Sequence, residues 1–335
     1  MMKNFLFPFF FLCAAIISCN ADSKKETPSK EFVFDSSDAK RDELLQTYSK
    51  MPETSDIISA GDTGMAVYRL CQERYSAKLA QLKQQADSLN AKFIITILTP
   101  EVGGSVTFST QKGIPFINEA AKKLGISCYD FSTPLSKYTP EQFTQMPIDG
   151  HWSAAGAKII SEMYKPLMEG TKNFRSSKNF SDKERPAIFG DQLPNQDEAL
   201  DGGKELPYRL VTNSQGFRMN YNLTFPKVKQ RILFLGDSQV YSPFLDNEEI
   251  TTSLLQQHFP EKEIINAGVI GYTLDDQVEL MEQRAKYIEP DIIILVTNPN
   301  DIGDFYFTMR NLLSRSKKAH TPSSIELDLY KKMFK

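Results

Sequence analysis

Residues 231–238 read Arg-Ile-Leu-Phe-Leu-Gly-Asp-Ser (RILFLGDS), and this stretch decides the fold class. An apolar run closed by turn-forming residues is typical of a strand buried on both faces, as strands of parallel sheets are. Four more runs of this kind occur, at 93–98 (FIITIL), 126–131 (ISCYDF), 263–266 (EIIN) and 292–297 (IIILVT). The sequence therefore predicts five strands of one parallel sheet.

Helical patterns separate these strands, because apolar residues recur there every three or four positions. We expect helices over 65–89, 115–124, 153–164, 250–259, 274–287 and 301–313. Gly125 predicts the end of the second helix, Ser153 the N-cap of the third, and Pro166 the limit of that third helix. Strands that alternate with helices predict an α/β fold, here a single doubly wound three-layer sheet.

The composition is that of a globular protein, with 41% hydrophobic and 24% charged residues among 335. The net charge of −3 argues against a nucleic-acid binder, which needs a basic surface. We divide the chain into a signal peptide (1–18), a polar tether (19–60), one half of the domain (61–170), a connection (171–230) and the other half (231–335).

The first 18 residues are predicted to be an export signal rather than part of the fold. Lys3 precedes an apolar run over 5–17 that is too short to span a bilayer comfortably. The run ends in Ile-Ile-Ser-Cys at 16–19, which looks like a bacterial lipobox with Cys19 as the lipidated residue. We therefore expect a lipid-anchored protein of the bacterial cell envelope, periplasmic or outer-membrane associated. A plain secretory signal and an unusual membrane anchor are the alternatives.

Three predicted strands end in residues that suit acyl chemistry. Ser238 follows the first, the segment 266–271 (NAGVIG) the second, and the segment 298–301 (NPND) the third. The carboxyl ends of parallel strands are where active sites gather. Ser238 could be a nucleophile, and its own N–H, the N–H of Gly271 and the Asn300 side chain could form an oxyanion hole.

A serine nucleophile needs a base, and the chain has only three histidines. His151 lies in the segment 149–156 (DGHWSAAG), where Asp149 is close enough in sequence to reach back to Nδ1. That contact would fix the tautomer and leave Nε2 to face Ser238. His258 and His320 are predicted to lie on the surface.

The segments GDS, NAGVIG and NPND resemble the first three sequence blocks of SGNH (GDSL-type) hydrolases, and DGHWSAAG resembles their final Asp/His block. The resemblance covers most of residues 65–170 and 205–310, and YRLVTNSQGFRMN (208–220) resembles the lead-in to the GDS strand in bacterial members. It implies a flavodoxin-like three-layer fold with Ser238, His151 and Asp149 as catalytic residues and Ser238, Gly271 and Asn300 as the oxyanion hole.

The order of the blocks departs from that of most SGNH members, because the Asp/His block here precedes the Ser block. The order, and the DxHW form of the Asp/His block, are similar to those of the alginate O-acetyltransferase group (AlgX- and AlgJ-like proteins). The resemblance therefore implies a circularly permuted SGNH domain, with the old termini joined through the connection. The Gly that usually opens the third block is replaced by Asn298.

Two classes of function remain open. One is a serine esterase or O-acyltransferase acting on ester-linked acyl groups. Its expected substrates are O-acetyl groups of an envelope glycan, and its expected partners are acetylation proteins of the envelope. The other is a non-catalytic envelope lipoprotein of the same fold that binds glycan or assembles with a partner. Neither needs a cofactor or a metal ion.

Several of these residues could have a purely structural role. His151 could serve stability alone, Trp152 is expected to pack in support of the base, and Asp237 is expected to brace a turn. Asp301 could brace the Asn300 loop or cap the following helix. The two cysteines after the tether, Cys71 and Cys128, are either a disulfide or two unpaired thiols.

Overall fold

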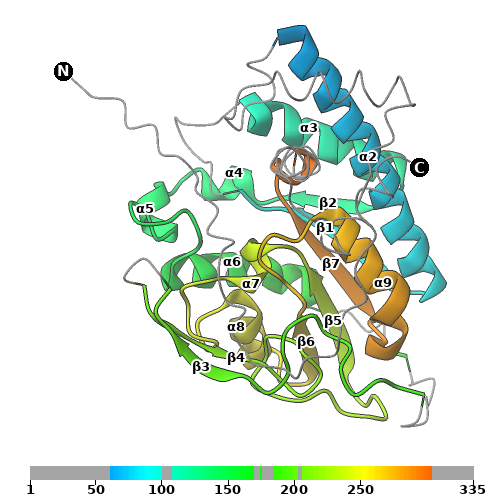
Figure 1. Ribbon diagram of the computed structural model, residues 1–335, viewed down its shortest axis with the longest axis vertical. Helices are drawn as coiled ribbons and strands as arrows, with labels where there is room; N and C mark the ends of the chain where they lie inside the picture. Colours follow the sequence, from blue (N-terminus) through cyan, green and yellow to red (C-terminus); the bar gives the residue numbers. More distant parts are fainter. Residues whose placement is uncertain (1–60, 100–107, 170–173, 176–183, 203–205, 304–335) are drawn as a thin grey trace, which may run out of the picture.

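The computed structural model describes residues 61–99, 108–169, 174–175, 184–202 and 206–303 (Figure 1). Residues 1–60, with the signal, Cys19 and the tether, and residues 304–335, with most of the last predicted helix and His320, lie outside that part. The helices are α2 Gly61–Ser88, α3 Phe108–Lys123, α4 Ser132–Leu135, α5 Pro140–Phe143, α6 Ala154–Met168, α7 Ser238–Tyr241, α8 Thr251–His258 and α9 Leu274–Ile288. The strands are β1 Lys92–Ile97, β2 Ser127–Asp130, β3 Asp197–Leu200, β4 Tyr208–Val211, β5 Gln230–Leu235, β6 Lys262–Asn266 and β7 Ile292–Thr297.

Five strands form one parallel sheet in the order β2-β1-β7-β5-β6. The α/β fold and the five-stranded parallel sheet predicted from the sequence are thus confirmed. β7 is the central strand and pairs with β1 on one side and β5 on the other, so that Ile292 faces both Lys92 and Ile232. The strands of the N-terminal half and those of the C-terminal half therefore meet in a single sheet.

The strand order identifies the place where a ligand can enter. If the count starts at β5, the sheet has the doubly wound order 2-1-3-4-5, with the chain opened between its third and fourth strands. In that order the connections turn to opposite faces between the first and third strands, which leaves a crevice at their carboxyl ends. Here that crevice lies between the ends of β5 and β7, where residues 236–238 and 298–301 follow.

Two layers of helices cover the sheet (Figure 1). α2, α3 and α9 pack on one face, against side chains such as Phe93, Ile95 and Leu233. α6 and α8 pack on the other face, against the alternate side chains, such as Ile94, Ile232 and Ile294. Alternation of buried side chains to both faces explains why these strands read as unbroken apolar runs.

The opposite, amino-terminal edge of the sheet is closed by buried ion pairs. Lys227 lies 2.8 Å from Asp291, and Arg231 lies 2.5 Å from Glu263. Arg231 also donates to the carbonyl of Ile288 at 2.9 Å. Paired charges and satisfied carbonyls fill this edge, so the carboxyl edge is the one left for chemistry.

Several helix boundaries follow the sequence prediction, and two do not. Ser153 caps α6 by accepting from the N–H of Gly156 at 3.1 Å, and Gly125 has φ +66° after α3. Pro166, expected to end the helix, lies inside α6, which continues to Met168. Pro115, expected at the start of a helix, lies inside α3, which begins at Phe108.

The predicted connection contains a small antiparallel hairpin of β3 and β4, with Asp197 opposite Val211. It lies beside α7 and contributes Tyr208 and Leu210 to a cluster with Tyr241. The connection is therefore packed onto the segment that follows Ser238, which the sequence did not predict.

None of the described helices is both long and apolar enough to cross a bilayer. Cys71 is buried and Cys128 is half-buried, and the two are not joined by a disulfide. Of the two alternatives for these cysteines, the disulfide is therefore wrong.

Candidate active site

Ser238 is the first residue of α7 and is half-buried at the carboxyl end of β5. The chain leaves the strand through Gly236, where a Cβ atom would lie 2.4 Å from Cγ2 of Val240 and 3.1 Å from the carbonyl oxygen of Val296. Only glycine fits so close an approach between the ends of β5 and β7. The position of Ser238 therefore depends on this glycine and on the crevice beside β7.

Asp237 braces the turn, as predicted. Its Oδ1 accepts from the N–H of Gln239 at 2.9 Å and so caps α7. Burial raises the pKa of the Asp237 carboxyl, while the Gln239 N–H and the charge of His151 oppose that shift. Asp237 therefore holds the turn that carries Ser238.

Asp149 and His151 form the predicted pair. Asp149 Oδ1 accepts from the backbone N–H of His151 at 2.8 Å and is hydrogen bonded to its Nδ1. A carboxylate can only accept, so the proton of a neutral imidazole lies on Nδ1 and leaves Nε2 as the basic nitrogen. The Asp149 side chain is 8% exposed and that of His151 is 22% exposed, so the pair faces solvent through the imidazole.

The loop that carries His151 is held on both sides of that residue. Gln145 donates its N–H to the His151 carbonyl at 2.8 Å, and Ser153 donates to the carbonyl of Phe143 at 3.1 Å. Gly156 allows this packing, because a Cβ atom there would lie 1.8 Å from the Phe143 carbonyl oxygen. The first turn of α6 therefore packs directly against the backbone of Phe143.

Trp152 joins the His151 loop to the Ser238 helix. Its indole is fully buried and stacks on Phe143 with ring centroids 5.9 Å apart. Its Nε1 donates to the carbonyl of Gln239 at 3.2 Å, across 87 positions of sequence. The residue after the candidate base is thereby bonded to the residue after the candidate nucleophile. The side chain packs in support of the loop, as expected.

Gly271 and Asn300 follow the two strands that flank β5. Gly271 is exposed with φ +78°, in a loop whose Gly268 lies so near α7 that a Cβ atom would be 2.4 Å from the Tyr241 nitrogen. Asn300 is exposed, and its N–H donates to Oδ1 of Asn298 at 3.0 Å. Both residues therefore lie at the carboxyl edge that also carries Ser238.

The structure brings some of the predicted residues together and not others. Asp149 and His151 are in direct contact, and the neighbours of His151 and Ser238 are bonded through Trp152 and Gln239. Among the described residues, neither His151, Gly271 nor Asn300 has a hydrogen bond to Ser238. The complete triad and the oxyanion hole remain predictions.

Asp301 braces the Asn300 loop, which is the first of the two roles predicted for it. Its Oδ2 accepts from Thr297 Oγ1 at 2.6 Å and from the Asn298 N–H at 3.1 Å. Its Oδ1 is buried and has no partner among the described residues. Burial, and then the nearby charge of Asp237, raise the pKa of Asp301 to about 8, so this carboxyl is largely protonated at neutral pH.

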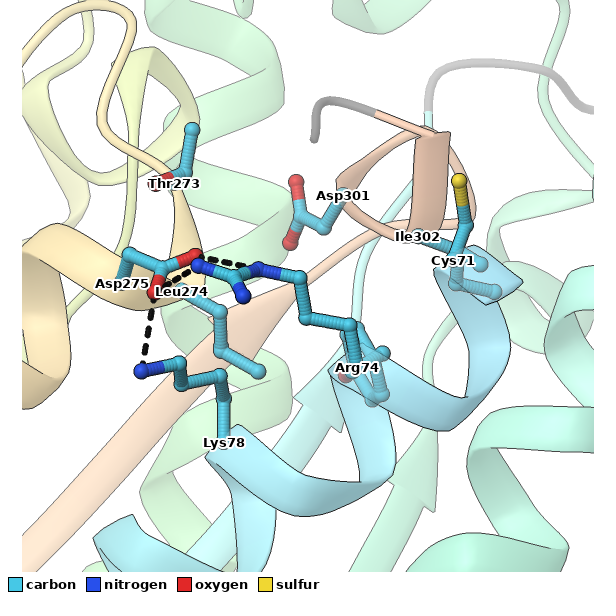
Figure 2. A pocket seen from close by; sticks show the side chains of 9 residues that line it. Cys71, Arg74, Lys78, Thr273, Leu274, Asp275, Asp301 and Ile302 are labelled. Atoms are coloured by element: carbon cyan, nitrogen blue, oxygen red, sulfur yellow. Dashed lines mark hydrogen bonds and ion pairs between the residues drawn. The ribbon is translucent and has the colours of Figure 1, made fainter. Parts of the chain in front are cut away.

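A cavity of about 10 Å³ lies beside Asp301, between α2 and the start of α9 (Figure 2). Across it, Arg74 and Lys78 are both paired with Asp275, at 2.8 and 3.0 Å. The volume holds about one water molecule, which is too little for an acyl group. The cavity is therefore too small to be a substrate-binding pocket.

Phe244 is a site residue that the sequence analysis missed. Its ring lies edge-to-face with the His151 imidazole, at 5.9 Å and 67°. No periodicity or motif marks it in the sequence. Of the remaining histidines, His258 is exposed as predicted. Within the described ranges, no group of three His, Cys, Asp or Glu side chains is arranged to hold a metal ion.

Comparison with known proteins adds little. No protein-family model matches the sequence, and no curated protein matches it. Among solved structures, the O-acetyltransferase domain of Pseudomonas putida AlgJ is similar at 11% sequence identity, over 73% of this chain and 92% of that chain, with a TM-score of 0.45. A likeness of this size carries nothing about the residues of the site.

Proposed function

We propose that the protein is a serine-dependent acyl-transfer enzyme, an esterase or an O-acyltransferase. One observation carries the proposal: the Asp149–His151 pair lies on a loop that Trp152 bonds to the helix beginning with Ser238. A carboxylate-oriented imidazole beside a strand-end serine is the arrangement that nucleophilic acyl transfer requires. The four sequence blocks support the same assignment.

Each group has one task in the proposed reaction. Ser238 Oγ attacks the acyl carbonyl carbon while His151 Nε2 takes its proton, and Asp149 holds the imidazolium. The tetrahedral oxyanion is stabilised by the N–H groups of Ser238 and Gly271 and by the Asn300 amide, worth a few kcal/mol each. His151 then gives its proton to the leaving alcohol oxygen, which breaks the ester bond and leaves an acylated Ser238.

The second half of the reaction decides between the two enzyme classes. Water that attacks the acyl-enzyme gives a carboxylic acid and an esterase. A sugar hydroxyl that attacks gives a new ester and an O-acyltransferase. In both cases His151 takes the proton of the attacking hydroxyl and returns it to Ser238. The substrate we propose is an O-acetylated envelope glycan, with acetylation proteins of the envelope as partners.

A fluorophosphonate probe tests the nucleophile. The folded wild type is expected to be labelled at Ser238, and Ser238→Ala is expected to remain unlabelled. Absence of wild-type labelling, or equal labelling of Ser238→Ala, would favour the non-catalytic lipoprotein instead. Acetyl-donor turnover with and without a glycan acceptor then separates the two classes, since acceptor-independent acetate release at an undiminished rate counts against a transferase.

We also propose that Cys19 is lipidated and anchors the protein in the cell envelope. The Ile-Ile-Ser-Cys segment supports this proposal. Metabolic labelling with radioactive palmitate is expected to mark the wild type and not Cys19→Ala, which should be found in the soluble fraction. Equal labelling of both would refute the assignment of Cys19.

A further inference from the structure

The loop over 242–247, directly after the Ser238 helix, has an unusual backbone. Ser242 and Phe244 have φ values of 60° and 66°, in the left-handed region that bulky side chains rarely adopt. Such conformations persist only where the surrounding structure imposes them, and they cluster at functional sites. The loop presents the half-buried Phe244 ring to His151 at 5.9 Å.

Arg218, from the connection, imposes this loop conformation. Its side chain is fully buried and donates from Nη1 to the carbonyl of Ser242 at 2.8 Å and to that of Tyr241. Nη2 donates to the carbonyl of Leu245, and Nε donates to Oδ1 of Asn247 at 3.0 Å. One planar guanidinium thus binds four acceptors around the turn, which a lysine could not reproduce.

The β3–β4 hairpin holds the same loop from outside. Asn247 exchanges two hydrogen bonds with the backbone of Val211 in β4, at 3.1 and 2.6 Å. The Tyr208 ring lies 6.1 Å from the Phe244 ring and 5.4 Å from the Arg218 guanidinium carbon. Phe244 is therefore packed between the hairpin and the imidazole.

We propose that Phe244 is a positioning residue for the His151 imidazole and that Arg218 acts through it. The inference rests on the proposed function. Asp149 fixes one edge of the imidazole by a hydrogen bond at Nδ1, and the Phe244 ring packs against it at a steep angle. The two contacts together restrict rotation of the ring and keep Nε2 directed at the Ser238 turn. The connection thereby completes the site.

The first test compares Phe244→Ala, Phe244→Tyr and the matched control Phe116→Ala. Phe116 is a half-buried aromatic residue of α3, in the helical layer that does not contain α6, and its ring centroid lies 5.8 Å from that of Tyr75. With a small acetyl ester, Phe244→Ala is expected to lower kcat ten- to a hundredfold with KM within twofold, because the loss concerns the base rather than binding. Phe244→Tyr is expected to stay within threefold of wild type, and Phe116→Ala to leave kcat unchanged.

The second test is a double-mutant cycle of Arg218→Lys and Phe244→Ala. If Arg218 acts through Phe244, the double variant has the kcat of Phe244→Ala alone, although Arg218→Lys by itself lowers kcat. Multiplicative losses would overturn the role of Arg218. If Arg218→Lys does not fold, the comparison of Phe244→Ala with Phe244→Tyr decides the inference.

The outcomes also separate this inference from the proposed function. A wild type that the fluorophosphonate probe does not label refutes the acyl-transfer function itself. If wild type and Phe244→Ala are labelled equally and hydrolyse the acetyl ester equally fast, the role of Phe244 is refuted. The proposed function then still stands, provided that Ser238→Ala is neither labelled nor active.

Discussion

Replacing Trp152 by Phe removes the hydrogen bond that joins the candidate base loop to the candidate nucleophile helix. The Nε1 donor to the Gln239 carbonyl is lost, while Ser242 Oγ still donates to that carbonyl at 3.3 Å. The lost bond then costs about 1 kcal/mol, and the smaller ring in a fully buried site costs roughly another 1 kcal/mol. The free energy of unfolding should therefore fall by about 2 kcal/mol, or about 4–8 °C in Tm.

The same substitution should affect activity more than this stability loss explains. A loop displaced by about 1 Å can lower the rate of the chemical step about a hundredfold. We expect the labelling rate of Ser238 by fluorophosphonate to fall at least tenfold at 25 °C. Circular dichroism at the same temperature should be used to check that the variant is folded.

Leu82→Ala is the control for Trp152→Phe. Leu82 is fully buried on α2, in the other helical layer, and its truncation should cost 2–5 kcal/mol. This variant should lose at least as much stability as Trp152→Phe and keep the wild-type labelling rate. If Trp152→Phe loses stability but is labelled as fast as the wild type, Trp152 is a core residue only and the link to the base is refuted.

Three further predictions concern other contacts of the site. Asp149→Asn should lower fluorophosphonate labelling about 10³–10⁴-fold, because the amide stabilises the wrong tautomer; labelling within tenfold of wild type would contradict the role of the pair. A raised pKa means that the folded Asp301 binds its proton more tightly than the unfolded chain does, so stability falls as pH rises from about 4 to about 8. Asp301→Asn should flatten that decline in urea midpoints, and parallel curves for variant and wild type would count against the assignment. Gly156→Ala should cost about 3 kcal/mol in urea unfolding, since its Cβ would lie 1.8 Å from the Phe143 carbonyl oxygen, whereas Gly150→Ala has open space and should cost under about 1 kcal/mol; equal costs would refute the packing argument.

The sheet could be predicted because a strand that is buried on both faces must consist almost entirely of apolar residues. The runs that became β1, β5 and β7 are almost wholly apolar for that reason. The boundary at Pro166 was wrong because a proline removes one N–H donor, and the rest of α6 is held by packing of residues such as Ile160 and Tyr164. Tertiary packing overrode the local rule there.

The site could be predicted only where its geometry is local. Asp149 and His151 are two positions apart, so their contact follows from the sequence itself. Phe244 reaches His151 because Arg218, which lies 24 positions before Ser242, fixes a left-handed turn. Neither periodicity nor spacing encodes that contact. The raised pKa of Asp301 likewise depends on burial and on Asp237, which only the assembled sheet brings near.

The central place of β7 has a consequence for the order in which the parts of the chain can fold. β1 and β2 are made first, but two parallel strands are not stable by themselves, and the partner of β1 on its other side is 200 positions further on. Lys92 pairs with Ile292, close to the end of the described chain. β1 and β2 therefore cannot complete a stable sheet until nearly all of the described domain is available for folding. Folding then proceeds as one late event rather than half by half.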